Sequence, residues 1–370
     1  MKVLQVLPNL NSGGVERGTV EFARELVAQG HESIVLSNGG RLVVQLEAEG
    51  SRHISLPVHK KSLWQLRWVR RLRRLLEELQ PDIIHVRSRA PMWLIWLAWR
   101  KLPAANRPRL VSTFHGLYSV NAYSAVMAKA EQVIAISDCV ADYVQRNYGV
   151  PRARLTVIPR GVDLAAFSPR PPAQEWCAAL YRDYPHLKGK TIILMPGRLS
   201  RWKGQEAYLQ MMQQLQARAP ECHGVIVGDA EPKKAHYRKE LEQQARALGL
   251  ADHVTFVGHR ADIAEFYRLA QVVCHMSNKP EPFGRTLTEA LAAGTPVVAF
   301  DRGGASESLS ACFPQGLVAP DDITAFTEKV AAMLGPKPEI TVLPAFTMTH
   351  QINATLSVYR QLLNPSETAQ

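Results

Sequence analysis

The stretch PEPFGRTLTEALAAGTPVVAFD, residues 280–301, decides how the rest of the chain is interpreted. Two acids, Glu281 and Glu289, bracket a Pro-Phe-Gly turn and the first turns of a predicted helix. The apolar run 296–300 after that helix predicts a buried strand. A glycine turn that leads into a helix N-terminus can bind an anion, but acids there also stabilise the helix macrodipole without any ligand. The stretch therefore predicts a helix and a strand. Its two acids could bind a ligand or could have a purely structural role.

Strands alternate with helices on both sides of this stretch. In the second half we predict strands at 191–194, 224–227, 254–257, 272–275 and 296–300, with helices around 205–218, 234–248, 263–270, 285–293 and 323–334. The first half shows the same alternation from residue 2 to residue 158. This pattern predicts an α/β fold with parallel sheets, in which ligands bind at the carboxyl ends of the strands.

The clearest linker signal is Pro-Arg-Pro-Pro at 169–172. It divides the chain into a first domain at 1–168 and a second at 173–345, each large enough for its own core. The last predicted helix, 348–363, follows a second Pro-rich break and could pack back on the first domain.

The net charge of +11 comes from the first half of the chain alone. Residues 1–170 carry 24 Lys+Arg and 13 Asp+Glu, whereas residues 171–370 carry 20 of each. A one-sided basic half indicates an anionic partner such as phospholipid, phosphorylated saccharide or nucleic acid, although a merely soluble basic surface would look the same. Five scattered cysteines without a CxxC pair indicate a reducing compartment, and the apolar run 91–99 is too short to span a bilayer.

Much of this charge lies in KKSLWQLRWVRRLRR, residues 60–74, where arginines alternate with Trp64, Trp68 and aliphatic residues. A basic amphipathic helix with tryptophan suits a membrane interface, and an ordinary packed helix with a solvated basic face is the alternative. No RNA- or DNA-binding motif accompanies the charge, so we expect an anionic membrane surface and no nucleic acid.

Three further motifs follow predicted strands. Asn-Ser-Gly-Gly at 11–14 opens the first helix, and Gly13 and Gly14 would let a phosphate approach the backbone, although a plain tight turn is equally compatible. His115 follows a strand at the carboxyl edge of the sheet, where it could be structural or touch substrate. In PGRLSRWKG, residues 196–204, Arg198 and Lys203 suit a diphosphate, because arginine offers a fork and lysine a point charge. A solvated basic loop is the alternative.

Taken together, these motifs resemble the GT-B glycosyltransferases of family 4, a retaining group that uses nucleotide-sugar donors. The resemblance covers nearly the whole chain, and Glu281-x7-Glu289 is its most specific part. It implies two Rossmann-like, doubly wound domains that face a central cleft. Its one departure lies at 229–231, where Asp-Ala-Glu replaces the more usual glycine after Gly-Asp.

The resemblance also implies a role for each motif residue. Arg198 and Lys203 would hold the donor diphosphate, Glu281 the sugar hydroxyls and Glu289 the ribose, while His115 would contact the sugar near the reacting carbon. The resemblance thus makes His115, Arg198, Lys203 and Glu281 the catalytic group. The other donor-binding residues are Gly13 and Gly14 on the phosphate side, and Gly284, Arg285 and Thr286 at the helix start.

A resemblance to bacterial enzymes of lipopolysaccharide core synthesis is weaker. It implies transfer from a nucleoside-diphosphate sugar to a saccharide or glycolipid acceptor, on the cytoplasmic face of the inner membrane. No D-x-D motif occurs, so we expect no metal and no cofactor beyond the donor. An epimerase, a phosphorylase and a non-catalytic membrane scaffold are the alternatives, and the sequence does not indicate an oligomeric state.

Overall fold

A computed structural model describes residues 1–11, 13–231 and 234–364, apart from the Leu63 side chain. Ser12 of the Asn-Ser-Gly-Gly motif lies outside these described residues. The chain forms two compact units, one of Met1–Pro159 with the chain from Gln351 onward, and the other of Arg160–His350. The predicted linker at 169–172 therefore belongs to the second unit.

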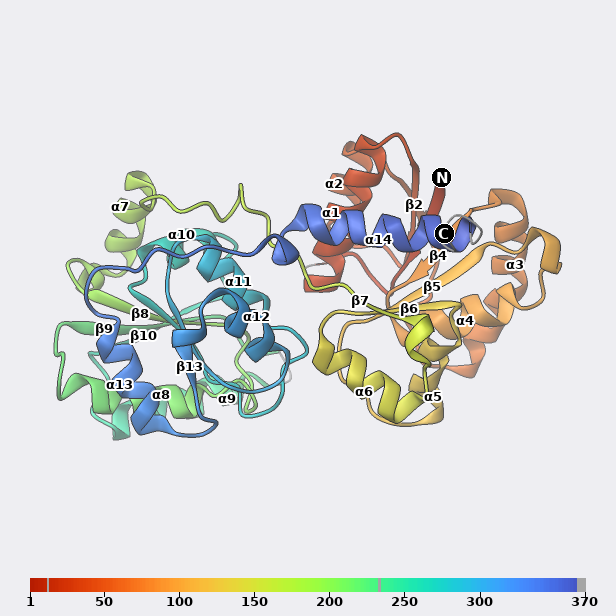
Figure 1. Ribbon diagram of the computed structural model, residues 1–370. Coiled ribbons are helices and arrows are strands. Elements are labelled where there is room, and N and C mark those ends of the chain that lie inside the picture. Colours follow the sequence, from red (N-terminus) through yellow and green to blue (C-terminus); the bar gives the residue numbers. More distant parts are fainter. Residues whose placement is uncertain (12, 232–233, 365–370) are drawn as a thin grey trace. The chain divides into compact units, whose positions relative to one another are not determined.

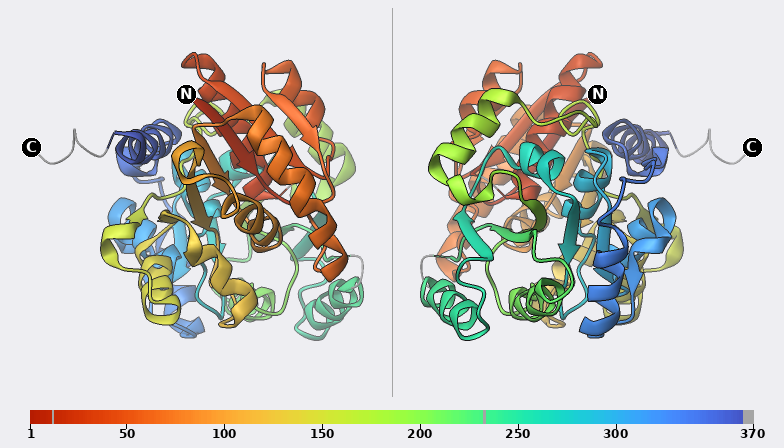
Figure 2. Two further views of the ribbon diagram at one scale, coloured as in Figure 1. Left: turned by 90° about the vertical axis from the view of Figure 1, so that its right-hand side faces the viewer. Right: turned by 90° about the vertical axis from the view of Figure 1, so that its left-hand side faces the viewer.

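The first unit contains a seven-stranded parallel sheet in the order β3-β2-β1-β4-β5-β6-β7 (Figure 1). Its strands are β1 (Lys2–Val6), β2 (Glu32–Ser37), β3 (Arg52–Ser55), β4 (Ile83–Val86), β5 (Arg109–Phe114), β6 (Gln132–Ala135) and β7 (Leu155–Val157). The helices that flank it are α1 (Gly14–Ala28), α2 (Val43–Ala48), α3 (Arg67–Leu79), α4 (Arg89–Trp99), α5 (Ala122–Ala125), α6 (Asp138–Tyr148) and α14 (Met348–Leu363) (Figure 2). The predicted basic helix starts later than expected, because Leu63–Leu66 is a 3-10 turn before α3.

Helix α14 packs against the first unit through Tyr359, which is fully buried. The Tyr359 hydroxyl lies 2.6 Å from His85 Nδ1, and the other ring nitrogen of His85 lies 2.6 Å from Thr113 Oγ1. The Tyr359 ring also meets Phe22 of α1 edge-on. These contacts attach the end of the chain to β4, β5 and α1.

The second unit contains a six-stranded parallel sheet in the order β10-β9-β8-β11-β12-β13. Its strands are β8 (Thr191–Pro196), β9 (Cys222–Val227), β10 (Val254–Gly258), β11 (Val272–His275), β12 (Val297–Phe300) and β13 (Leu317–Val318). The helices are α7 (Gln174–Asp183), α8 (Gln205–Gln216), α9 (His236–Ala247), α10 (Ile263–Leu269), α11 (Arg285–Ala292), α12 (Gly304–Cys312) and α13 (Ile323–Ala332). Both orders confirm the two Rossmann-like domains that the alternating pattern predicts.

Successive residues of these strands enter two different cores. Ile193 and Met195 of β8 pack with α8, α9 and α13, whereas Ile192 and Leu194 pack with α7, α10, α11 and α12. This alternation follows from the two-residue period of a strand, and it explains why the strands read as continuous apolar runs. Figure 1 shows the two helix layers above and below the sheet.

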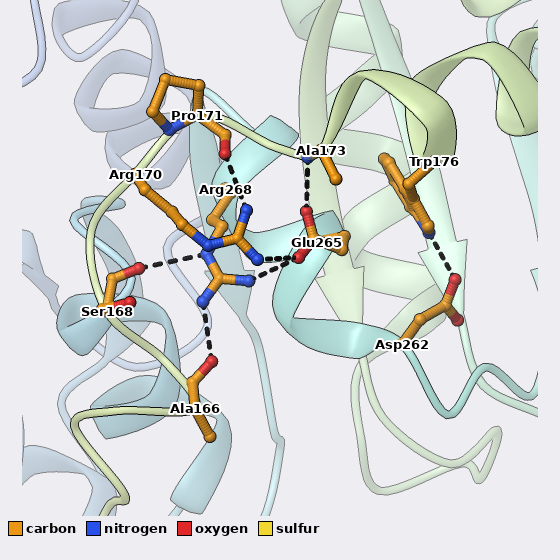
Figure 3. A network of polar contacts seen from close by, with 9 residues as sticks. All are labelled: Ala166, Ser168, Arg170, Pro171, Ala173, Trp176, Asp262, Glu265 and Arg268. Carbon is orange, nitrogen blue, oxygen red and sulfur yellow. Dashed lines mark hydrogen bonds and ion pairs between the residues drawn. The ribbon is translucent and has the colours of Figure 1, made fainter.

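The Pro-rich segment is attached to α10 by buried polar contacts (Figure 3). Arg268, whose side chain is 2% exposed, donates to the carbonyls of Ala166 and Ser168 and pairs with Glu265. The same carboxylate accepts from Arg170 and from the backbone N–H of Ala173. The segment is thus ordered by its contacts with the second unit.

Candidate functional site

The loops after β8 and β11 lie against each other at the carboxyl edge of the second sheet. The Asn278 N–H donates to the Trp202 carbonyl at 2.9 Å, and the Asn278 side chain donates to the Arg201 carbonyl. Gly204 adopts φ +84°, and a Cβ there would lie 1.9 Å from the Met276 carbonyl oxygen. Glycine is therefore required for the contact that brings the 196–204 loop to the residues preceding Glu281.

Glu281 is buried in a polar cluster at this contact. Its Oε1 lies 2.5 Å from Lys203 Nζ, accepts from Ser277 Oγ at 2.5 Å and lies 2.9 Å from His275 Nε2. This histidine nitrogen lies at ion-pair distance without meeting the geometry of a hydrogen bond. Only 7% of the Glu281 side chain and 18% of the Lys203 side chain are exposed. The structure thus brings together two of the predicted catalytic residues.

The ionisation of Glu281 is set by two opposing effects. Burial by itself would raise the pKa of this carboxyl, but His275 and Lys203 together hold the pKa well below its ordinary value. Glu281 is therefore a carboxylate at neutral pH, able to accept hydrogen bonds and unable to donate a proton.

Arg198 lies on the same loop as Lys203 but has a different partner. Its guanidinium pairs with Glu231, after β9, at 2.5 Å, and about half of each side chain is exposed. Lys234 and then Arg198 lower the pKa of Glu231, which also pairs with Lys234 at 3.2 Å. Glu231, one residue of the 229–231 stretch that departs from the family pattern, therefore faces the predicted diphosphate-binding arginine.

Helix α11 carries the second acid of the opening stretch. Glu289 accepts from the Tyr267 hydroxyl at 3.1 Å and pairs with Arg285 one turn earlier at 3.3 Å. Gly284 caps the helix with φ +81°, and Thr286 is half-buried in the first turn. These residues lie together at one helix, as the sequence predicts, and Glu289 has protein partners there.

Three of the predicted residues lie in the first unit. His115 follows β5 directly, at the carboxyl edge of its sheet, and its N–H lies 3.4 Å from the Tyr118 hydroxyl. Gly13 caps α1 and Gly14 begins it, with both residues exposed. A Cβ at Gly13 would lie 2.2 Å from Glu16 Oε2, so the acid of the first turn folds back over this glycine. The roles assigned to these residues stay predictions.

Sequence reasoning missed three residues of the site: His275, Ser277 and Glu231. The signal for His275 and Ser277 was available, because both stand where the predicted strand 272–275 ends. For Glu231 the only signal was the departure from the family pattern. Within the described ranges, no group of three or more His, Cys, Asp or Glu side chains could hold a metal ion. No helix among the same residues is long and apolar enough to cross a membrane.

The comparisons with known proteins agree with this architecture. The model of Glycosyltransferase Family 4 matches residues 12–166, and that of Glycosyl transferases group 1 matches residues 180–339. The lipopolysaccharide core biosynthesis mannosyltransferase LpsB of Rhizobium meliloti (strain 1021) is 28% identical over 249 residues, which are 64% of this chain and 68% of LpsB.

Two solved structures extend the likeness to the whole chain. A glycosyltransferase from Rickettsia africae ESF-5 is 29% identical with a TM-score of 0.88, over 99% of both chains. Anabaena Alr3699/HepE, in complex with UDP-glucose, is 23% identical with a TM-score of 0.75, over 100% of both chains, and shows the fold alone. The fold and the two matched models define a glycosyltransferase with the GT-B architecture. The chain belongs to the family 4 glycosyltransferases.

Proposed function

We propose that this glycosyltransferase moves a hexose from a nucleoside-diphosphate sugar to a saccharide hydroxyl with retention of configuration. The observation that carries the proposal is the buried cluster of Lys203, Glu281, His275 and Ser277 at the carboxyl edge of the second sheet. A buried carboxylate beside a cation, in a chain of this family, suits a ligand that has both hydroxyl groups and phosphates.

Two members of the cluster, Glu281 and Lys203, have chemical tasks in this proposal, together with Arg198 and Glu289. Glu281, a carboxylate at neutral pH, accepts hydrogen bonds from the sugar hydroxyls. Lys203 and Arg198 hold the diphosphate and stabilise the negative charge that develops as it leaves. Both cations have carboxylate partners in the structure, so donor binding requires them to share or exchange these partners. Glu289 would accept from the ribose, beside Gly284, Arg285 and Thr286.

In this proposal the acceptor hydroxyl attacks the sugar from the same face as the one from which the leaving group departs, and the configuration is therefore retained. The leaving phosphate takes the proton of the acceptor hydroxyl as the new glycosidic bond forms, so no enzyme nucleophile is needed. His115 would contact the sugar near the reacting carbon, and Gly13 and Gly14 would face phosphate. No metal ion or cofactor takes part besides the donor.

The acceptor is proposed from two independent features. The first is the similarity to LpsB, a mannosyltransferase of lipopolysaccharide core biosynthesis. For the donor, LpsB and the UDP-glucose complex of HepE make mannose and glucose donors the first to test. The basic first half fits phosphorylated saccharide and anionic lipid. We therefore propose a lipopolysaccharide core or related cell-envelope glycan as the acceptor, at the cytoplasmic face of the inner membrane.

A thermal-shift screen of UDP-, GDP- and ADP-sugars would test donor binding first. The best donor should stabilise the protein, and Lys203→Ala should reduce the shift while Arg201→Ala, an exposed neighbour on the same loop, should not. Transfer to a core saccharide is then followed by NMR, where an unchanged anomeric configuration and an unchanged rate in EDTA are expected.

Three results would contradict the proposal. Release of nucleoside diphosphate without sugar transfer would indicate an epimerase or a phosphorylase. No stabilisation by any nucleotide sugar would indicate a non-catalytic scaffold. An inverted product would exclude same-face attack.

A further inference from the structure

The first unit contains an apolar cavity that the donor machinery does not use. Its volume is about 510 Å³, within the roughly 300–1,000 Å³ of small-molecule sites. One wall is α4, with Ala90, Trp93 and Leu97, and the other is the segment before α3, with Lys60, Lys61 and Leu66. Figure 1 shows α3 and α4 side by side, and the 3-10 turn Leu63–Leu66 leads into α3.

The cavity has an apolar wall and a basic rim. Trp93 uses its one polar atom to donate to the Tyr123 carbonyl, so its indole brings no unpaired donor to the wall. Lys60 and Lys61 are exposed at the rim, and Lys61 lies 5.2 Å from the centre of the Tyr123 ring. The cavity therefore suits a ligand with an apolar body and an anionic head.

The surface around the cavity has the same two properties. Trp64 is 79% exposed and Leu66 is 48% exposed. Such exposure of neighbouring large apolar side chains is unusual on a surface that faces only water. Arg67, Arg70, Arg71 and Arg74 are exposed on α3, which follows the turn directly. Residues 51–130 carry 15 Lys+Arg and only three Asp+Glu. Exposed tryptophan among basic residues is typical of segments that lie in the interface of an anionic bilayer.

We propose that this cavity binds one acyl chain of an anionic membrane phospholipid, whose phosphate lies against Lys60 and Lys61. Trp64 and Leu66 enter the headgroup region beside it, and the arginines of α3 meet neighbouring lipid phosphates. The inference rests on the proposed membrane-side function and adds a specific lipid site to a general electrostatic attraction. It assigns the basic segment two tasks, adsorption by charge and retention by a captured chain.

Calorimetry of the full chain with lysophosphatidylglycerols of increasing chain length, below the concentration at which they form micelles, would test the site. Affinity should rise about fourfold for each CH₂ that enters the cavity. Leu97→Trp and Ala90→Phe fill the cavity from two positions of α4 and should abolish this dependence, with circular dichroism confirming the fold. Lys60→Gln with Lys61→Gln should weaken binding about fivefold for each charge removed. Lys188→Gln with Lys190→Gln, two exposed lysines of the second unit, removes the same charge and should change nothing.

Two outcomes would overturn the proposal. Chain-length dependence that survives both filling variants would place the lipid elsewhere, and absence of binding to any lysophospholipid would exclude the site. Adsorption of the filled variants to phosphatidylglycerol vesicles, lost at high salt, is expected and would separate the attraction of charge from the captured chain. The assay contains no nucleotide sugar, so a failure of the lipid site and a failure of the proposed transfer reaction are distinguishable.

Discussion

Two ion pairs of the second unit have the same length and opposite surroundings. Lys203–Glu281 and Arg198–Glu231 are both 2.5 Å long. The first pair is 18% and 7% exposed, with Ser277 and His275 around the carboxylate, whereas the second is 52% and 44% exposed. Removing one partner of a buried pair leaves an uncompensated buried charge. When one partner of an exposed pair is removed, water solvates the remaining charge at little cost in folding free energy.

This difference separates two kinds of predicted donor contact. The Lys203–Glu281 pair belongs to the folded structure and holds the loop after β8 against the loop after β11. The Arg198–Glu231 pair is exchangeable, so a diphosphate can replace Glu231 with little loss of folding energy. The two predicted diphosphate-binding residues should therefore respond differently to mutation.

Lys203→Ala should give the largest effect of the variants considered. Loss of the cation at the leaving diphosphate should lower kcat roughly 100- to 1,000-fold, about 2.7–4 kcal/mol in the barrier. Glu281, left buried without its lysine, should also lower the free energy of unfolding by about 3 kcal/mol. Steady-state kinetics and urea denaturation measure the two effects, and Arg201→Ala, on the same loop with a 64% exposed side chain, is the matched control. Near-normal turnover in Lys203→Ala would contradict its assigned role.

Glu265 allows a buried and an exposed ion pair to be compared on one carboxylate. It pairs with the buried Arg268 and with the exposed Arg170 (Figure 3). Arg268→Ala removes a 2% exposed cation and leaves the carbonyls of Ala166 and Ser168 without it, so the free energy of unfolding should fall by about 3 kcal/mol. Arg170→Ala removes a 47% exposed cation and should cost less than about 1 kcal/mol. Equal losses in urea denaturation would show that burial does not distinguish the two partners.

The depressed pKa of Glu281 predicts a pH dependence of stability. A carboxyl whose folded-state pKa lies below its unfolded value of 4.5 contributes stability above that value, and this contribution is lost as the pH falls toward the folded-state pKa. The free energy of unfolding should therefore fall more steeply between about pH 5 and about pH 3 in the wild type than in Glu281→Gln. Denaturant titrations across this range measure the slopes, and parallel curves would show that Glu281 titrates normally.

Much of the fold was predictable because strand and helix periods are properties of local sequence. The strand predicted at 272–275 is β11, and the helix predicted at 323–334 is α13. Helix α12 was missed because its GGASES start reads as a turn. Those glycines are required by a tertiary contact: a Cβ at Gly304 would lie 2.2 Å from the Pro282 carbonyl oxygen. Strand β13 has only two residues, too few for any period.

The site was predictable in its positions but not in its pairings. Strand ends show where polar side chains collect, which is how Arg198 and Lys203 were identified, whereas Glu281 was identified as an acid directly before a glycine turn. Which carboxylate meets which cation depends on how separate loops pack. The Gly204 contact that brings Lys203 to Glu281, and the approach of Glu231 to Arg198, join residues that are far apart in the sequence.

The smallest effect should come from Glu231→Gln. Because this exposed carboxylate competes with the donor diphosphate for Arg198, its loss should lower the donor KM by about twofold and leave the unfolding midpoint unchanged. Arg198→Ala should raise the donor KM instead, again with little change in stability. Glu240→Gln, which removes an exposed acid paired with Arg201, is the matched control and should leave KM unchanged. A higher donor KM in Glu231→Gln would show that Glu231 orients Arg198 for the donor, and the exposed pair would then be as much a part of the site as the buried one.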